Sequence, residues 1–358
     1  MGRVDKLMLL VVFLITILGV VFIYSATWDR DNSGITLNKF VMKQCLFVVI
    51  GFILLFIIMN ADYMKMLDFA YLAYAINLAA LLFLLIFGGE RFGAKRWISL
   101  GPFSLQPSEF VKITVIFALA IFLGDRREKI GTVKNYFYSI GIVLPAFILI
   151  FLQPDLGTAF VLIPILLAVL FICGERVKYM AFTVLAGLAS MPIFWSFLKS
   201  YQKNRLLVFL NPNIDPLGAG YTIIQSKIAI GSGGILGKGW LAGTQSHLKF
   251  LPERHTDFIF SVIGEEWGFV GGVILILLYT FVIMRGIRII NNTDDIYGRA
   301  IATGIVTLLA FQVLVNIAMT IGLMPVVGLP LPAISYGGSN TVTFLIAMGF
   351  LLNVGRRA

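Results

Sequence analysis

A run of polar residues from Glu253 to Asp257 leads directly into an apolar segment that continues to Met284. Asp257 stands at the expected start of a helix, where the helix dipole favours the charged carboxylate and burial opposes it. A carboxylate balanced in this way can act as a general base, whose pKa should lie near the working pH. We therefore take Asp257 as the candidate catalytic residue; the alternative, a helix cap, needs no chemistry.

Neighbouring polar residues are weaker candidates. His255 can bind substrate or carry protons, although a single surface histidine usually does neither. Glu265 and Glu266 lie inside the apolar run, where ionisable groups are costly and are functional candidates by default. A helix would place them away from Asp257 and would put small residues on its face, which predicts a groove below the carboxylate. The small residues on that face are Ser261, Gly264 and Gly268.

Glu109 and Lys112 open another apolar segment and are three residues apart, so they share a helix face and can pair. Ser108 is the expected N-cap of this helix. A lone Lys112 in lipid would be costly, so a partner is expected. Two interpretations stay open: a buried ion pair that fixes helix packing, and direct contact of Lys112 with a phosphate group.

Two further segments combine polar residues with chain breakers. Asp155, in a polar turn between apolar segments, can cap the next helix or place a second acidic group in a cleft. The segment 316–340 ends one apolar run and begins another, with three prolines and a Gly-Gly pair between. Irregular backbone at membrane depth must face protein or a water-filled cavity. We therefore expect this segment to line a cavity, with Ser335 as a candidate substrate-binding residue.

The composition predicts an all-α polytopic membrane protein. Of the 358 residues 59% are hydrophobic and 13% are charged, against about 25% charged in soluble domains. Apolar runs long enough to cross a membrane predict ten spans: 7–26, 41–59, 69–87, 108–124, 137–152, 156–173, 179–197, 258–285, 300–321 and 339–354. The two cysteines, Cys45 and Cys173, fall in different runs, so we expect neither a disulfide nor a metal pattern.

Charge predicts the orientation of these spans. Lys and Arg are more frequent in the short segments on the side of the N-terminus, which places both termini in the cytoplasm. The net charge of +10 is assigned to this bias and to an anionic membrane or substrate rather than to nucleic acid. The long loop 198–257, between spans 7 and 8, is then extracytoplasmic, and a single domain over 1–358 is the simplest account. The glycine-rich stretch 231–239 lacks the phosphate-loop pattern, which favours a tight or flexible turn.

Taken together, five blocks resemble the SEDS family (shape, elongation, division and sporulation), and its elongation type in particular. The blocks occur in family order along the whole chain: Arg96–Lys112, Gln153–Ala159, Asn211–Ser226, Gly243–Gly268 and Asn316–Ser339. The stretch from Gly243 to Phe260 carries the most specific part of the resemblance. One departure is Asn340, where the family usually has Ser or Ala.

The resemblance implies a peptidoglycan glycosyltransferase that polymerises lipid II, a disaccharide-pentapeptide on undecaprenyl pyrophosphate. It also implies the outer face of the cytoplasmic membrane as location and a class B penicillin-binding protein, a transpeptidase, as partner. By resemblance, Asp257 matches the essential aspartate of the family. The buried acid and base pair matches Glu109 and Lys112, the second acidic position matches Asp155, and Lys43 stands where the family often has Arg.

The chemistry of such a transfer assigns roles to these residues. Asp257 would accept the proton of a sugar hydroxyl. Lys43, Lys112 and Arg205 are candidates to stabilise the departing pyrophosphate as fixed positive charge. A divalent cation such as Mg²⁺ or Mn²⁺ would serve the same end, but no metal-binding pattern demands one. Two other functions stay open: a transporter that flips a lipid-linked cell-wall precursor, and a non-catalytic scaffold for a transpeptidase.

Overall fold

Long apolar helices make up most of the protein in the computed structural model, which describes residues 5–28, 39–88, 96–100, 103–211, 214–216, 218–248 and 250–357. Within these residues, eight single helices are long and apolar enough to cross a membrane. They are α1 (Lys6–Thr27), α2 (Lys39–Asn60), α4 (Ala70–Phe87), α5 (Pro107–Gly124), α6 (Val133–Leu152), α13 (Ile259–Asn292), α14 (Ile296–Thr320) and α15 (Gly338–Arg357). The prediction of an all-α polytopic membrane protein is confirmed.

The remaining elements are short. They are α3 (Tyr63–Leu67), η1 (Arg127–Lys129), α7 (Leu156–Ile172), α8 (Val177–Ala189), α9 (Met191–Phe197), α10 (Ser200–Leu210), α11 (Ala219–Ser232) and α12 (Thr244–His247). One antiparallel hairpin, not predicted from the sequence, joins β1 (Ile98–Leu100) to β2 (Phe103–Leu105), with Ser99 opposite Ser104. The hairpin leads directly into α5 and so helps to set where that helix begins.

Each of the ten predicted spans falls on helix, but two differ from the expected single crossing. The segment 179–197 is broken into α8 and α9, which meet at a bend of 49°, because Pro192 in the first turn of α9 lacks an N–H group to continue α8. Helix α7 has 17 residues, at the short limit for a span. Counting the bent pair as one span raises the number to nine. Cys45 and Cys173 are both free thiols, as expected.

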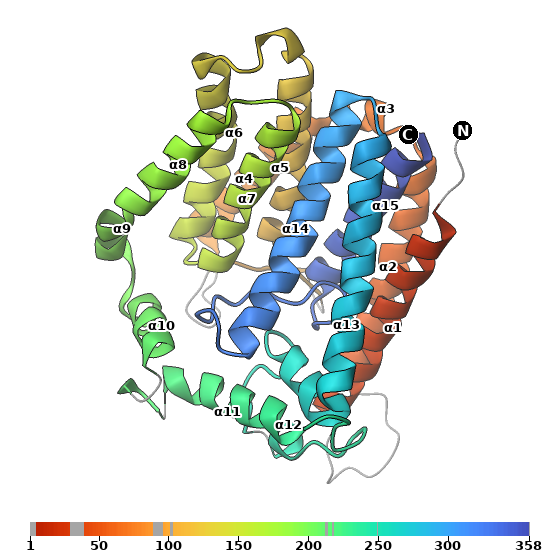
Figure 1. The fold of residues 1–358 in the computed structure, drawn as a ribbon, viewed down its shortest axis with the longest axis vertical. Helices are drawn as coiled ribbons and strands as arrows, with labels where there is room; N and C mark the ends of the chain where they lie inside the picture. Colours follow the sequence, from red (N-terminus) through yellow and green to blue (C-terminus); the bar gives the residue numbers. More distant parts are fainter. Residues whose placement is uncertain are drawn as a thin grey trace.

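Helices α5, α14 and α15 form the centre of the bundle and are buried along most of their length. Around them, α2 packs on α15, α7 on α14 and α4 on α5. Both termini lie at one end of the bundle, and α11 and α12 lie across the opposite end (Figure 1). The segment from α8 to α10 runs along one edge, and α8 and α9 contain no buried residue.

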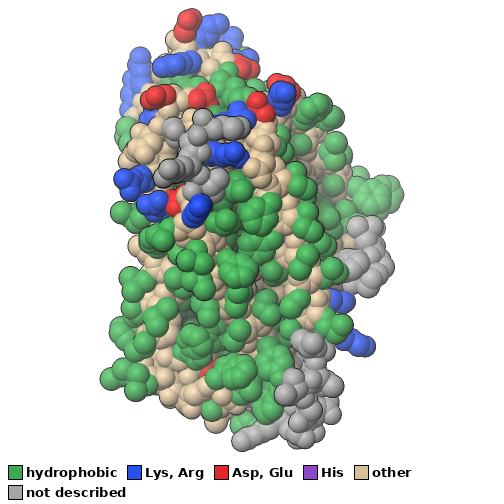
Figure 2. Space-filling model, turned by 90° about the vertical axis from the view of Figure 1, so that its right-hand side faces the viewer, with side chains coloured by type: hydrophobic (Ala, Val, Ile, Leu, Met, Phe, Trp, Pro, Cys, Tyr) green, Lys and Arg blue, Asp and Glu red, His purple; other side chains and the backbone are tan. Residues whose placement is uncertain are grey.

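The outer surface of the bundle is apolar between its two ends. Figure 2 shows hydrophobic side chains over the middle of one face, with Lys, Arg, Asp and Glu gathered at the end where the termini lie. Exposed apolar residues on α4, for example Leu72, Ile76 and Phe83, belong to this kind of surface. Contiguous exposed apolar area of this extent marks a surface made for lipid.

The long segment 198–257 is not a plain loop, because it contains the helices α10, α11 and α12. Helices α10 and α11 cover the stretches 204–210 and 221–230, each of which mixes basic and apolar residues. Helix α11 packs on α13 and α14. The Ser226 hydroxyl of α11 donates to the carbonyl of Thr320, at 2.6 Å, and lies 2.7 Å from the hydroxyl of Ser261. This part of the chain is therefore a packed cap on one end of the bundle.

Candidate active site

A polar cavity of about 560 Å³ opens at the end of the bundle opposite the termini. Its size is typical of a site for a small molecule or for part of a larger substrate. The residues that line the cavity come from α2, the β-hairpin, the first turns of α5, α7 and α15, and the segments 253–257 and 328–338. The acidic and basic residues that line it are Lys43, Arg96, Glu109, Asp155, Glu253, His255 and Asp257. Four predicted site residues besides Asp257 thus lie on this one cavity: Lys43, Glu109, Asp155 and His255.

Asp257 is held in the cavity through its backbone. The carbonyl groups of residues 255, 256 and 257 each accept a hydrogen bond from the segment 316–336. The donors, in that order, are the Tyr336 N–H at 2.8 Å, the Ser335 hydroxyl at 2.6 Å and the Asn316 amide at 3.0 Å. The same Asn316 amide donates to the Leu329 carbonyl at 2.7 Å. Three successive fixed carbonyls leave the loop little freedom, so the Asp257 carboxylate is preorganised.

The expectation that Asp257 begins a helix is wrong. Helix α13 starts at Ile259, its N-cap is Phe258, and no side chain caps it; Asp257 lies in the preceding turn. The interpretation of Asp257 as a helix cap therefore fails. Glycine is favoured opposite the carboxylate because Gly328 has a φ of 72°, although a Cβ there would only touch an Asp257 oxygen, at 3.4 Å.

The predicted groove of small residues on α13 is also wrong, because α11 and the following turn fill that face. A Cβ on Gly233 would come within 1.9 Å of the Gly264 carbonyl oxygen, so these two glycines let the backbones touch. Gly268 has a φ of 65° and breaks α13 where the turn 235–237 packs against it. The small residues serve close helix packing rather than a cleft.

Burial dominates the electrostatics of Asp257. Burial first, and then the negative charge of Glu253, raise the pKa of Asp257 to about 6, although Arg205 and Arg96 act in the opposite direction. This is the balance that a general base requires, since the group is ionised at neutral pH and still basic enough to accept a proton. Burial likewise lowers the pKa of His255, which keeps the imidazole largely neutral at pH 7.

Asp155 fulfils both interpretations that the sequence left open. It is the N-cap of α7 and accepts from the Thr158 N–H at 3.3 Å, and it also lines the cavity. The Arg96 guanidinium lies 3.7 Å from its carboxylate. Arg96 also donates to the carbonyls of Gln153, at 3.0 Å, and Pro154. One arginine thus ties the chain before the β-hairpin to the turn that carries Asp155.

Glu109 and Lys112 form the predicted ion pair, with 2.8 Å between the ammonium and a carboxylate oxygen. Both side chains are almost fully buried. Glu109 lines the cavity, whereas Lys112 does not. This placement favours the ion-pair interpretation for Lys112 over direct phosphate contact. Helix α5 begins at Pro107 with Gln106 as N-cap, so the prediction of Ser108 as N-cap was two residues late.

Arg205 and Ser335, also predicted to bind substrate, lie outside the cavity lining. Arg205 is an exposed residue of α10 whose guanidinium lies 3.4 Å from the Val326 carbonyl, and its charge acts on Asp257 from there. Ser335 is fully buried, and its hydroxyl both donates to the Thr256 carbonyl and accepts from the Leu331 N–H at 2.8 Å. These contacts favour a structural role for Ser335, namely holding the Asp257 loop.

The two carboxylates inside the apolar run are structural. One Glu265 oxygen accepts from the Lys238 ammonium at 2.9 Å and from the backbone N–H groups of Thr244 and Gln245 at 2.7 and 2.9 Å. Glu266 accepts from the Ser25 hydroxyl of α1. The glycine-rich stretch forms tight turns against this part of α13, with positive φ at Gly234, Gly237 and Gly239, as the sequence indicated.

Aromatic residues of the cavity were missed as site residues. Phe40, Phe47, Trp97 and Tyr336 line it together with the charged groups, and the Phe40 ring lies 5.1 Å from the His255 ring. The spacing of Phe40, Lys43 and Phe47 on α2 is three and four residues, which places them on one helix face and was the available signal. Arg96 had no such signal, because its partners are 57 or more residues away in sequence.

Fold and site together define a class of protein. It is a helical membrane protein with a polar cavity at one end, and the cavity is built around a preorganised carboxylate. The chain belongs to the FtsW/RodA/SpoVE family, the SEDS family indicated by the sequence: the model of that family, described as "Cell cycle protein", matches residues 5–358.

Curated relatives match over nearly the full chain. The peptidoglycan glycosyltransferase MrdB of Escherichia coli (strain K12) is 40% identical over 95% of this chain and 92% of that protein. The stage V sporulation protein E of Bacillus subtilis (strain 168) is 39% identical over 98% and 97%, and the peptidoglycan glycosyltransferase RodA of Treponema pallidum (strain Nichols) is 35% identical over 99% and 98%.

Solved structures share the fold. A chain from a structure of a peptidoglycan synthase complex, concerned with the coordination of polymerization and crosslinking, matches with a TM-score of 0.81 and 35% identity, covering 99% of this chain and 98% of that one. The rod shape determining protein RodA of Thermus thermophilus matches with a TM-score of 0.74 and 31% identity, covering 99% and 97%.

Proposed function

We propose that this chain is a peptidoglycan glycosyltransferase that polymerises lipid II into glycan strands during cell elongation, with Asp257 as general base. The observation that carries the proposal is the Asp257 carboxylate. It lines a polar cavity, its loop is held by three hydrogen bonds to backbone carbonyls, and its pKa is raised to about 6. The relatives named peptidoglycan glycosyltransferase support the same chemistry over the full length of the chain.

In the proposed reaction a sugar hydroxyl of one substrate molecule attacks the anomeric carbon of another. The bond from that carbon to the pyrophosphate oxygen breaks, undecaprenyl pyrophosphate leaves, and Asp257 accepts the hydroxyl proton. Lys43 and Arg96 line the cavity and would stabilise the departing charge directly. Arg205 and Lys112 lie outside the lining, so their positive charge would act over a longer distance.

A divalent cation is the other candidate to stabilise the departing pyrophosphate. Among the described residues, no three His, Cys, Asp or Glu side chains come together to hold one. A divalent cation would therefore have to rest on Asp155 or Asp257 and on oxygens of the substrate itself.

The proposed setting is the cytoplasmic (inner) membrane, with ten crossings, both termini in the cytoplasm and the cavity on the extracytoplasmic face. The bias of Lys and Arg toward the terminal side supports this orientation. We treat residues 1–358 as one functional domain. The proposed partner is a class B penicillin-binding protein, supported by the similarity to a chain of a peptidoglycan synthase complex.

Purified protein supplied with radiolabelled lipid II separates the three candidate functions, and we expect glycan polymer to form. Translocation of lipid II across a liposome membrane without polymer would instead establish a transporter, the second candidate. Neither product, in the presence of a correctly folded protein, would leave the scaffold function.

The rate of polymerisation should depend on pH through Asp257. Because the base must be ionised, log(kcat/KM) should rise with unit slope up to about pH 6, the pKa of Asp257, and level off above it. Glu253→Gln removes a negative charge that raises this pKa, so the rise should move to lower pH. Arg205→Gln removes a positive charge that lowers it, so the rise should move to higher pH. A profile that is flat from pH 5 to 8, or shifts of the opposite sign, would contradict the assignment.

A further inference from the structure

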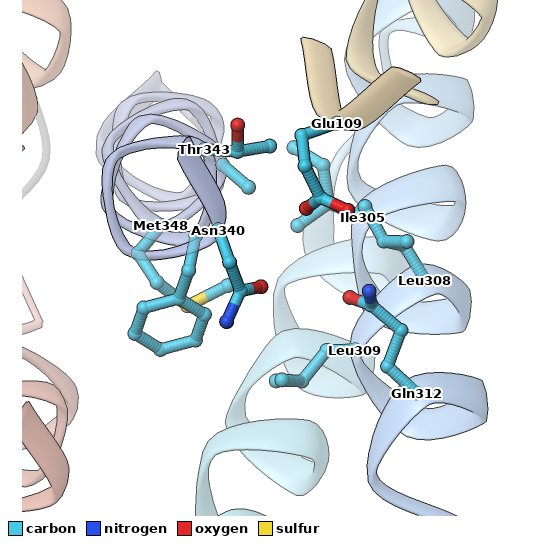
Figure 3. Close-up of a pocket in the computed structure, with 10 residues that line it drawn as sticks. Glu109, Ile305, Leu308, Leu309, Gln312, Asn340, Thr343 and Met348 are labelled. Atoms are coloured by element: carbon cyan, nitrogen blue, oxygen red, sulfur yellow. The ribbon is translucent and has the colours of Figure 1, made fainter. Parts of the chain in front are cut away.

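A second, much smaller cavity lies between α5, α14 and α15, deeper in the bundle than the polar cavity (Figure 3). It has room for about one water molecule. Glu109 and Asn340 line both cavities, so the two share a wall. The small cavity otherwise has an apolar lining, apart from Gln312 of α14 and Thr343 of α15.

Three polar groups around this cavity lack partners within the described part of the protein. The amide nitrogens of Gln312 and Asn340 and the hydroxyl of Thr343 are buried and make no hydrogen bond there. These three side chains are at most 6% exposed. An unsatisfied buried group of this kind costs about 1–3 kcal/mol. Three such groups around one cavity are therefore an arrangement that calls for a ligand.

The chemistry of the groups identifies that ligand. Each amide nitrogen is a donor, so the two unpartnered nitrogens require an acceptor. Figure 3 shows the Glu109 carboxylate and the amides of Asn340 and Gln312 pointing into the space between the helices. Among the described lining residues, Glu109 is the only ionisable one. A water molecule can accept from the two amides and donate to the carboxylate, which satisfies both sides at once.

We propose that this cavity binds one water molecule that links Gln312, Asn340 and Thr343 to the carboxylate of Glu109. The site meets the two conditions for a buried water, namely room for it and two to four polar partners. One Glu109 oxygen is already held by Lys112 at 2.8 Å. The water would fix the carboxylate from the side of α14 and α15, which makes Gln312, Asn340 and Thr343 positioning residues for a group on the active-site wall.

A direct test is an experimental map of the full-length protein in lipid nanodiscs, at a resolution that shows ordered water. We expect a density peak within hydrogen-bond distance of Gln312, Asn340 and Glu109 in the wild type and no peak in Gln312→Met. A wild-type map at that resolution without the peak would overturn the proposal.

Thermal unfolding gives a second test with a matched control. Thr343→Val removes a hydroxyl that the water satisfies, so Tm should fall by about 1–3 °C. The Tm of Thr343→Ser, which keeps the hydroxyl, should fall less. Thr303, on α14, is another buried threonine whose hydroxyl has no partner in the described structure, but it does not line this cavity. Thr303→Val should therefore leave Tm unchanged or raise it. Equal changes in Tm for Thr343→Val and Thr303→Val would contradict a bound water in the cavity.

The effect on catalysis rests on the proposed function. Gln312→Met should lower kcat for polymer formation about tenfold, because a misplaced group on the cavity wall weakens the reactive geometry. The KM for lipid II should stay within about twofold. A raised KM with unchanged kcat, or no change in either constant, would contradict the positioning role. Absence of activity in the wild type would instead refute the proposed function and leave the water site to be decided by the map and by Tm.

Discussion

Asp257→Asn should lower polymerisation of lipid II by the purified protein by about 10³-fold, the range typical of a lost general base. The amide has nearly the same shape as the carboxylate but cannot accept the proton of the sugar hydroxyl. The three hydrogen bonds that hold the loop go to backbone carbonyls, so the substitution leaves them intact. The fold should therefore persist, with Tm close to that of the wild type.

The matched control is Asp294→Asn, which makes the same chemical change at an exposed position in the short turn between α13 and α14. This variant should retain the activity of the wild type. Measurement of polymer yield and of Tm for both variants separates loss of chemistry from loss of fold. Activity of Asp257→Asn within tenfold of the wild type would exclude Asp257 as the base.

Local patterns were enough to predict most of the helices and the Glu109–Lys112 pair. Apolar runs located the spans because each run is long, and the pair followed from a spacing of three residues on one helix. The break between α8 and α9 was missed because Pro192 was read as part of a continuous apolar run. The short β-hairpin was missed because strands of three residues carry almost no periodic signal.

The site was predictable in its ionisable residues and not in its supports. Asp257, Asp155 and His255 stand out because polar residues beside apolar runs are rare. The three hydrogen bonds that hold the Asp257 loop are donated by residues 59 to 81 positions further along the chain, and no local pattern predicts such a pairing. For the same reason Glu265 looked functional: its partners, Lys238 and the first residue of α12, Thr244, become visible only when the cap has folded onto α13.

Lys112→Met should destabilise the protein by about 3–5 kcal/mol, because it leaves the Glu109 carboxylate buried without its ion partner. The double variant Glu109→Leu with Lys112→Met should recover most of that loss, since replacement of a buried ion pair by apolar side chains is often close to neutral. Reversible chemical unfolding in detergent micelles measures all three free energies. As a control, Arg357→Met breaks the half-exposed ion pair with Asp62 and should cost far less.

Activity of the double variant then separates the two roles of the pair. Glu109 lines the polar cavity, so we expect kcat to remain at least tenfold below the wild-type value even when stability has returned. Full recovery of activity would mean that the pair serves helix packing alone. If Lys112→Met by itself proved as stable as the wild type, Glu109 would have to be uncharged or hydrated without its partner, and the buried ion pair could not be what holds α5 at the cavity wall.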